Sequence, residues 1–246
     1  MQTPDRKMLF TDTSGNPVTR YDFRTGTGGL KWFISGPVPA KEICDQWETA
    51  RRVAQSGDLH SAAELFQSVA FQAADWPDAY FDLAYTYLLL GDADSAFGFY
   101  MRTDSLVPDG FFSTKTAIYT LLLEKDGQLP HGFYRTFAEI EDSDPARKRS
   151  FFSQLVLDYP WYPPSYAQLL SVGDSDAEKL ETIGKALLLA LDRDSKGKLY
   201  LEWALVNIRG NKGVQAKELL AKILTDDEFT FYYKELSRFV VASMGY

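Results

Sequence analysis

Small and apolar residues recur at helical spacing from residue 41 onward, and one set of them returns after 34 residues, as Gly57-Asp58 does at Gly91-Asp92. The other corresponding pairs are Trp47 and Phe81, Ala50 and Ala84, Val53 and Tyr87, Ala62 and Ala96, and Phe66 and Tyr100. Small side chains let paired helices approach closely, and larger ones fill the space beside them. A glycine in the left-handed conformation ends a helix. The pattern therefore predicts two units of helix, glycine turn and helix, the second ending at Pro108.

A unit of this length and order resembles the tetratricopeptide repeat. The second copy carries the motif residues Pro77, Tyr80, Leu83, Ala84, Tyr87, Gly91-Asp92, Ala96, Tyr100 and Pro108. The first copy is looser, with Gln46 and Thr49 in place of the usual aromatic residue and leucine. Because one hairpin cannot bury its own apolar face, copies must stack. The resemblance implies an all-α fold, a right-handed superhelix of about four to five helical hairpins.

Beyond Pro108 the repeat register weakens while the helical periodicity continues. The pattern predicts helices over residues 111–124, from Pro130, from Pro145, and over 163–173, 176–191, 198–209, 214–224 and 229–243. We expect three parts: an arm at 1–40, repeats at 41–142, and degenerate repeat-like hairpins with a capping helix at 143–246.

The arm at 1–40 is too rich in glycine and proline for helices. Residues 8–11 and 18–23 flank a turn cluster at 14–17 (SGNP), and 31–35 form a third apolar run. This predicts a short β-hairpin followed by an extended segment. The GTGG run at 26–29 lacks the Lys-Ser/Thr of a phosphate-binding loop, so we interpret it as a flexible turn.

The first helix of each unit carries a candidate binding strip on the face that lines the groove of tetratricopeptide proteins. Its residues are Trp47, Arg51, Phe81, Tyr85, Lys115 and Tyr119. They are spaced four apart within a helix and 34 apart between units, so stacking would align four aromatic rings flanked by two cations. Such a strip suits an extended peptide. Two alternatives stay open: the aromatic residues of the arm fill this groove from within, or the strip is simply core.

Residues with catalytic potential are few. His60 and His131 stand near helix starts without other metal-ligating residues at the required spacing, and both are expected to be solvent-exposed. Cys44 is expected to be a packing residue rather than a nucleophile. With no local catalytic, cofactor or metal motif, the sequence favours a protein that is not an enzyme and has no cofactor.

Composition narrows the remaining function classes. The net charge of −8 comes from 26 Lys and Arg against 34 Asp and Glu, which disfavours nucleic acid as a partner. Since no signal peptide or membrane-length apolar run is present, we expect a cytoplasmic protein without a membrane partner. The leading hypothesis is a protein- or peptide-binding scaffold or adaptor with a concave aromatic groove. The alternative is an acidic chaperone or immunity-like protein that masks a basic partner.

Overall fold

The computed structural model describes residues 7–11, 31–35, 39–141, 143–173 and 175–244. Its elements are β1 (Lys7–Thr11), β2 (Lys31–Ser35), α2 (Lys41–Gln55), α3 (Leu59–Gln72), α4 (Pro77–Leu90), α5 (Ala93–Leu106), α6 (Thr114–Lys125), α7 (Phe133–Glu141), α8 (Pro145–Asp158), α9 (Pro163–Val172), α10 (Asp176–Ala186), α11 (Arg193–Arg209), α12 (Gly213–Thr225) and α13 (Phe231–Ser243).

The two predicted repeat units are the hairpins α2–α3 and α4–α5. Gly57 and Gly91 turn between the paired helices with φ of +93° and +82°, in the left-handed region that favours glycine. The following Asp58 and Asp92 cap α3 and α5, because each carboxylate accepts the backbone N–H three residues on. These structures confirm the helical repeat and its resemblance to the tetratricopeptide repeat, and they explain locally why Gly-Asp recurs.

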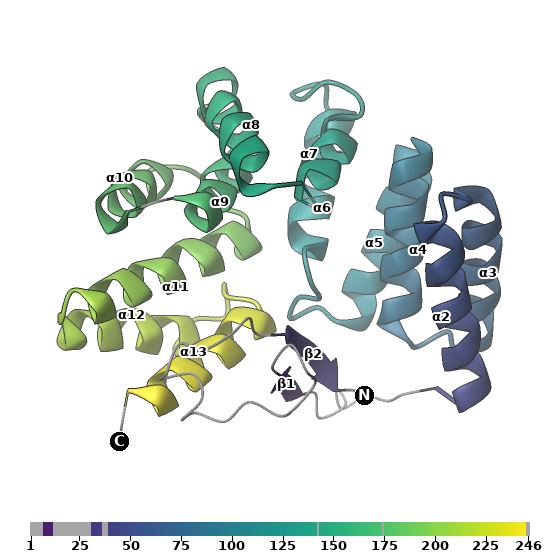
Figure 1. Ribbon diagram of the computed structural model, residues 1–246, viewed down its shortest axis with the longest axis horizontal. Coiled ribbons are helices and arrows are strands. Elements are labelled where there is room, and N and C mark those ends of the chain that lie inside the picture. The colour runs from purple at the N-terminus through teal and green to yellow at the C-terminus, as the bar shows by residue number, and fades with distance from the viewer. Residues whose placement is uncertain (1–6, 12–30, 36–38, 142, 174, 245–246) are drawn as a thin grey trace.

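The helices follow an arc (Figure 1), from α2–α5 at one end through α6–α8 to α9–α13 at the other. Consecutive helices pack against each other along most of this path, and α11 additionally contacts α6. One apolar cluster runs from α4 to the turn after α8 and contains the fully buried Tyr100, Phe137, Phe152 and Tyr162. The part of the fold built from α6 to α8 is therefore joined to the regular hairpins by a shared core.

The predicted helix bounds fail around residue 190. The helix expected over 176–191 ends at Ala186, and the helix expected from Lys198 begins at Arg193. The reason is a cap: the Asp192 carboxylate accepts the backbone N–H groups of Asp194 and Ser195 and so starts α11. Apolar periodicity alone does not locate this boundary, because the residue that sets it is a polar cap.

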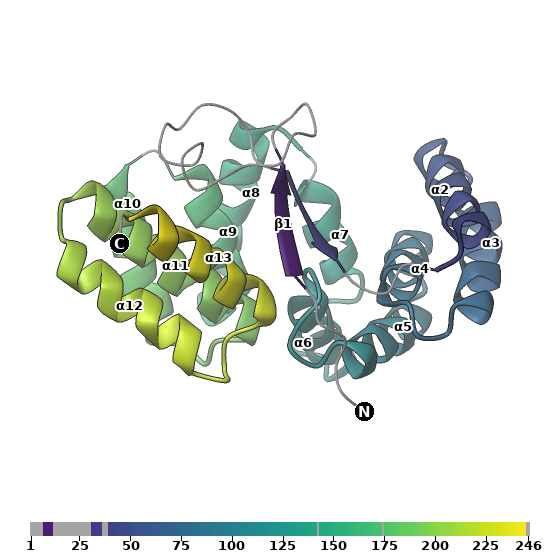
Figure 2. The ribbon, with the colours of Figure 1, turned by 90° about the horizontal axis from the view of Figure 1, so that it is seen from below.

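In the arm, β1 pairs with β2 in antiparallel register, with Lys7 opposite Ser35. The segment at 18–23, predicted as the partner of residues 8–11, and the GTGG run at 26–29 lie outside the described residues. β1 contacts α13. Figures 1 and 2 both place the strand pair between α13 and the N-terminal hairpins.

Gly197 in α11 allows the last helix to dock. A Cβ atom at this position would lie 2.0 Å from Cδ2 of Tyr233, whose side chain is buried on α13. Gly184 in α10 serves as the control for Gly197, because it is also a helical glycine but a Cβ there would meet nothing within 4 Å.

We predict that Gly197→Ala lowers the free energy of unfolding by about 1–3 kcal/mol, because the Tyr233 ring must move. Gly184→Ala should raise it by about 0.5–1 kcal/mol through helix propensity. Urea unfolding followed by circular dichroism measures both. Equal effects of the two substitutions would show that α13 does not pack on Gly197.

Candidate functional site

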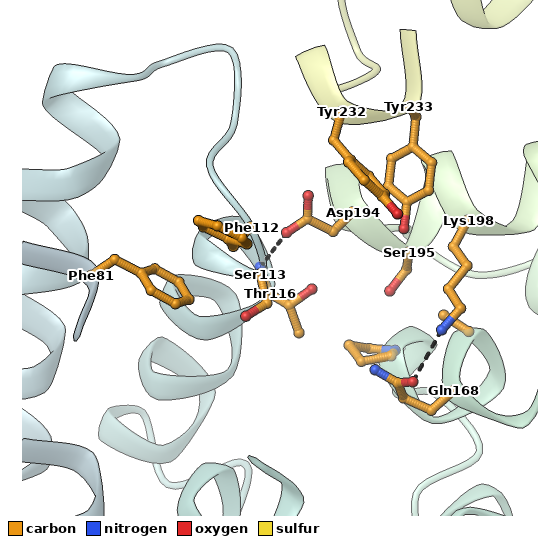
Figure 3. Close-up of a pocket in the computed structure, with 12 residues that line it drawn as sticks. Phe81, Phe112, Ser113, Thr116, Gln168, Asp194, Ser195, Lys198, Tyr232 and Tyr233 are labelled. Atoms are coloured by element: carbon orange, nitrogen blue, oxygen red, sulfur yellow. Dashed lines mark hydrogen bonds between the residues drawn. The ribbon is translucent and has the colours of Figure 1, made fainter. Parts of the chain in front are cut away.

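A pocket of about 290 Å³ lies where α4, α6, α9, α11 and α13 approach one another (Figure 3). Its apolar and aromatic lining residues are Phe81, Phe112, Pro164, Ala167, Tyr232 and Tyr233. Its polar lining residues are Ser113, Thr116, Gln168, Asp194, Ser195 and Lys198. This central pocket draws on residues more than 150 positions apart in the sequence. It therefore exists only because the middle of the arc, at α6 and the loop after α5, is held against α11 and α13.

The turn that opens α11 forms one connection between the C-terminal helices and the middle of the arc. Asp192 Oδ1 accepts the Thr116 hydroxyl at 3.0 Å as well as the N–H groups of its own turn. Asp194 Oδ2 accepts the backbone N–H of Thr116 at 3.1 Å, the bond drawn in Figure 3. Both carboxyl groups therefore bind α6, and both are buried.

Arg193, between these two acids, forms a second connection. Its guanidinium donates to the carbonyl oxygen of Pro108, at 3.1 Å, and to those of residues 227, 228 and 229. Beside it, the N–H of Phe231 donates to the carbonyl oxygen of Asp109. The loop after α5 and the start of α13 are thus held on either side of one arginine. We call residues 192–195 the latch.

The pKa of Asp194 is raised to about 8. Burial is the largest cause, and the neighbouring Asp192 carboxylate acts in the same direction. The Thr116 N–H, Lys115 and Arg193 act in the opposite direction without restoring the ordinary value. Burial also raises the pKa of Asp192, against the hydrogen bonds that it accepts. At neutral pH the Asp194 carboxyl therefore carries a proton that it can lose close to physiological pH.

The opposite wall of the pocket is aromatic. Phe112, in the loop before α6, has a φ of +46°, which is rare for a bulky residue, and its side chain is 36% exposed. Its ring lies 5.0 Å from that of Phe81, and Phe111 packs against both. On the α13 side, burial raises the pKa of Tyr232 to about 12, so its hydroxyl keeps its proton. The loop backbone thus holds an aromatic ring at the pocket in a strained conformation.

Of the six residues predicted to line the groove, Phe81 lines the central pocket. Tyr119 is half-buried and stacks on Tyr162 at 6.2 Å, and Tyr85 packs against the same core cluster. Lys115 forms an ion pair of 2.7 Å with Asp104. These positions place the predicted strip partly in the core.

The remaining two predicted residues form a separate cluster on α2 and α4. The Arg51 guanidinium lies 4.8 Å from the Trp47 ring centroid and 3.5 Å from Asp82 Oδ2. Burial raises the pKa of Asp82 to about 6, partly offset by Arg51. Trp47 also packs edge-on against Trp76 at 5.1 Å. The structure thus joins Trp47 and Arg51 to each other, and brings Phe81 to the pocket.

Sequence reasoning missed the latch, Phe112 and the α13 tyrosines. The run Asp192-Arg193-Asp194-Ser195 does carry a signal, since an acid before a helix start is a capping residue. That signal gives no indication of contacts with Thr116 on α6, which lies 76 residues from Asp192 and 78 from Asp194 in the sequence. The conformation of Phe112 has no sequence signal at all.

The reactive side chains considered earlier lie elsewhere. His60 and His131 are exposed, and Cys44 is half-buried with its thiol directed to the Pro39 carbonyl oxygen, as expected. Burial raises the pKa of that thiol. Within the described residues, no three His, Cys, Asp or Glu side chains gather as a metal would require. Nor does any helix in that part of the chain combine the length and apolar character needed to cross a membrane.

No protein-family model matches this chain, and no curated protein is significantly similar to it. Among solved structures, it is similar to MamA from Desulfovibrio magneticus RS-1, with 16% identity over 82% of this chain and 98% of that one, at a TM-score of 0.37. It is also similar to a tetratricopeptide repeat protein from Parabacteroides merdae, with 12% identity over 82% of this chain and 71% of that one, at a TM-score of 0.37. A third similar structure is TTC0263, a tetratricopeptide repeat protein from Thermus thermophilus, with 16% identity over 82% of this chain and 99% of that one, at a TM-score of 0.34. At such low scores these likenesses bear on no residue of the pocket.

The raised pKa of Asp194 predicts that the protein loses stability as the pH rises. The stabilisation from keeping this carboxyl neutral is complete below the unfolded-state pKa of about 3.9, and it is lost progressively up to about pH 8. The slope is at most about 1.4 kcal/mol per pH unit.

Urea unfolding between about pH 6 and pH 8 measures this slope. Asp194→Asn, which keeps an acceptor for the Thr116 N–H, should flatten it. Asp82→Asn is the control, because the Asp82 contribution ends near pH 6. Parallel curves for the wild type and Asp194→Asn over this range would contradict the assignment.

Proposed function

We propose that this chain is a non-enzymatic binding module that receives an extended segment of a partner protein in the central pocket. The observation that carries the proposal is the pocket itself, with Phe81 and Phe112 on one side and Tyr232 and Tyr233 on the other. Aromatic rings offer large contact area at little cost in side-chain entropy, and they are common at recognition surfaces. A volume of about 290 Å³ suits one or two side chains of a peptide.

The chemistry of the lining supports binding rather than catalysis. Neither histidine nor the cysteine lines the pocket. Asp194, whose pKa is raised, is hydrogen-bonded to the α6 backbone, and no nucleophile–base pair accompanies it among the described lining residues. Helical-repeat proteins in general present such inner surfaces to partners, which is an argument from fold alone.

The predicted strip extends this proposal beyond the pocket. A peptide seated against Phe81 and Phe112 would continue along the inner face toward Arg51 and Trp47, which lie on the neighbouring hairpin. Arg51 is exposed and already paired with Asp82 at 3.5 Å, so its contribution to binding a peptide carboxylate would be small. The pocket residues therefore contribute most to affinity in this proposal.

The test is peptide selection followed by substitution at two exposed phenylalanines. Random peptides displayed on phage are selected on the purified chain, and fluorescence anisotropy gives the Kd of an enriched peptide. Phe112→Ala should raise this Kd by at least about tenfold. Phe71→Ala, at an 89% exposed phenylalanine on α3 outside the pocket, should change it by less than about twofold.

Circular dichroism controls for folding of both variants. The proposal fails if no peptide is enriched on the wild-type chain. It fails equally if the two alanine variants bind the enriched peptide alike.

A further inference from the structure

Among the residues that the structure describes, the two buried carboxyl groups of the latch have no counter-ion. Asp192 and Asp194 are 9% and 8% exposed, and no ion pair reaches either of them in the described part of the chain. Asp192 Oδ2 is buried without a hydrogen-bond partner there. Asp194 lines the pocket, and its only hydrogen bond as an acceptor within the described residues uses Oδ2. Its other oxygen, Oδ1, points away from Thr116 in Figure 3.

The nearby cations are committed to other groups. Lys115 pairs with Asp104, Arg193 donates to four backbone carbonyl oxygens, and Lys198 Nζ donates to Gln168 Oε1 at 3.0 Å. The remaining titratable groups around Asp194 are Asp192 on its own turn and Tyr232 and Tyr233 on α13, while α9 contributes the neutral Gln168. The site therefore combines two acids with aromatic rings, and the cation among its described lining residues, Lys198, is hydrogen-bonded to Gln168.

We propose that the central pocket selects a basic side chain, lysine or arginine, of the bound partner segment, with its cation beside Asp194 and its alkyl stem between the aromatic walls. This inference rests on the proposed function and specifies its ligand. A cation there would make a charge-assisted hydrogen bond with the carboxylate. It would also be attracted to the faces of Phe81, Phe112 and the tyrosines. The net charge of −8 would assist encounter with a basic segment.

Binding by this route exchanges a proton for a cation. In the free protein the Asp194 carboxyl is neutral below about pH 8, so a cationic side chain binds well only after the proton leaves. Affinity for a basic peptide should therefore rise up to about tenfold per pH unit on approaching pH 8, with release of one proton. A neutral peptide should show no such dependence.

The experiment uses four blocked pentapeptides, acetyl-Ala-Ala-X-Ala-Ala-amide, in which X is lysine, arginine, norleucine or glutamate. Binding to the full chain is followed by the NMR signals of the Tyr232 and Tyr233 rings at about pH 6 and pH 8. At the higher pH we expect the lysine and arginine peptides to bind at least about tenfold more tightly than the norleucine peptide, and the glutamate peptide most weakly. Norleucine has the alkyl stem without the charge, so this ratio isolates the cation.

Asp194→Asn should reduce the lysine-to-norleucine ratio to within about twofold and abolish its pH dependence, while it keeps the hydrogen bond to α6. Asp82→Asn, a matched change of an acid with a raised pKa outside the pocket, should leave the ratio unchanged. If lysine and norleucine peptides bind equally, the inference fails and peptide binding itself stands. If none of the peptides shifts the tyrosine signals, both the inference and the pocket as a peptide site fail.

Discussion

The arrangement of this protein depends on the hydrogen bonds made by residues 192–195. Helical hairpins that stack in sequence contact only their neighbours, so helices far apart along an open array have no reason to meet. Here Asp192 and Asp194 bond to Thr116 on α6, and Arg193 joins the loop after α5 to the start of α13. These contacts join the middle of the arc to its C-terminal helices, and the central pocket lies beside them.

The contacts of Asp192 and Asp194 with α6 have an electrostatic cost, because both carboxyl groups are buried. Two carboxyl groups leave water for a site without a cation of their own, and the response is a raised pKa rather than a buried pair of charges. The four carbonyl oxygens that accept from Arg193 explain why that arginine does not neutralise its neighbours. The Asp194 carboxyl group, which a packed apolar core would exclude, therefore lies at the wall of a cavity. Such a placement is the pattern expected of a recognition site.

The extent to which the sequence predicted this structure follows from the range of each interaction. The hairpins α2–α3 and α4–α5 were predictable because Gly57, Asp58, Gly91 and Asp92 act on residues within four positions of themselves. The latch was not, because Asp194 meets Thr116 across 78 residues and its local pattern is that of an ordinary helix cap. Phe81 was predicted at the inner face because repeat register alone positions it. Phe112 was not, since its positive φ arises from the loop that the latch holds.

Native-state hydrogen exchange at two backbone amides tests this account most directly. The Thr116 N–H bonds to Asp194, and the Phe231 N–H bonds to the Asp109 carbonyl oxygen, so both depend on the latch although they belong to α6 and α13. In Arg193→Ala, the account predicts that exchange of both amides quickens together by about tenfold or more, while the Ala96 amide inside the second hairpin keeps its wild-type rate. Unchanged exchange at Thr116 and Phe231, or an equal increase at Ala96, would contradict it.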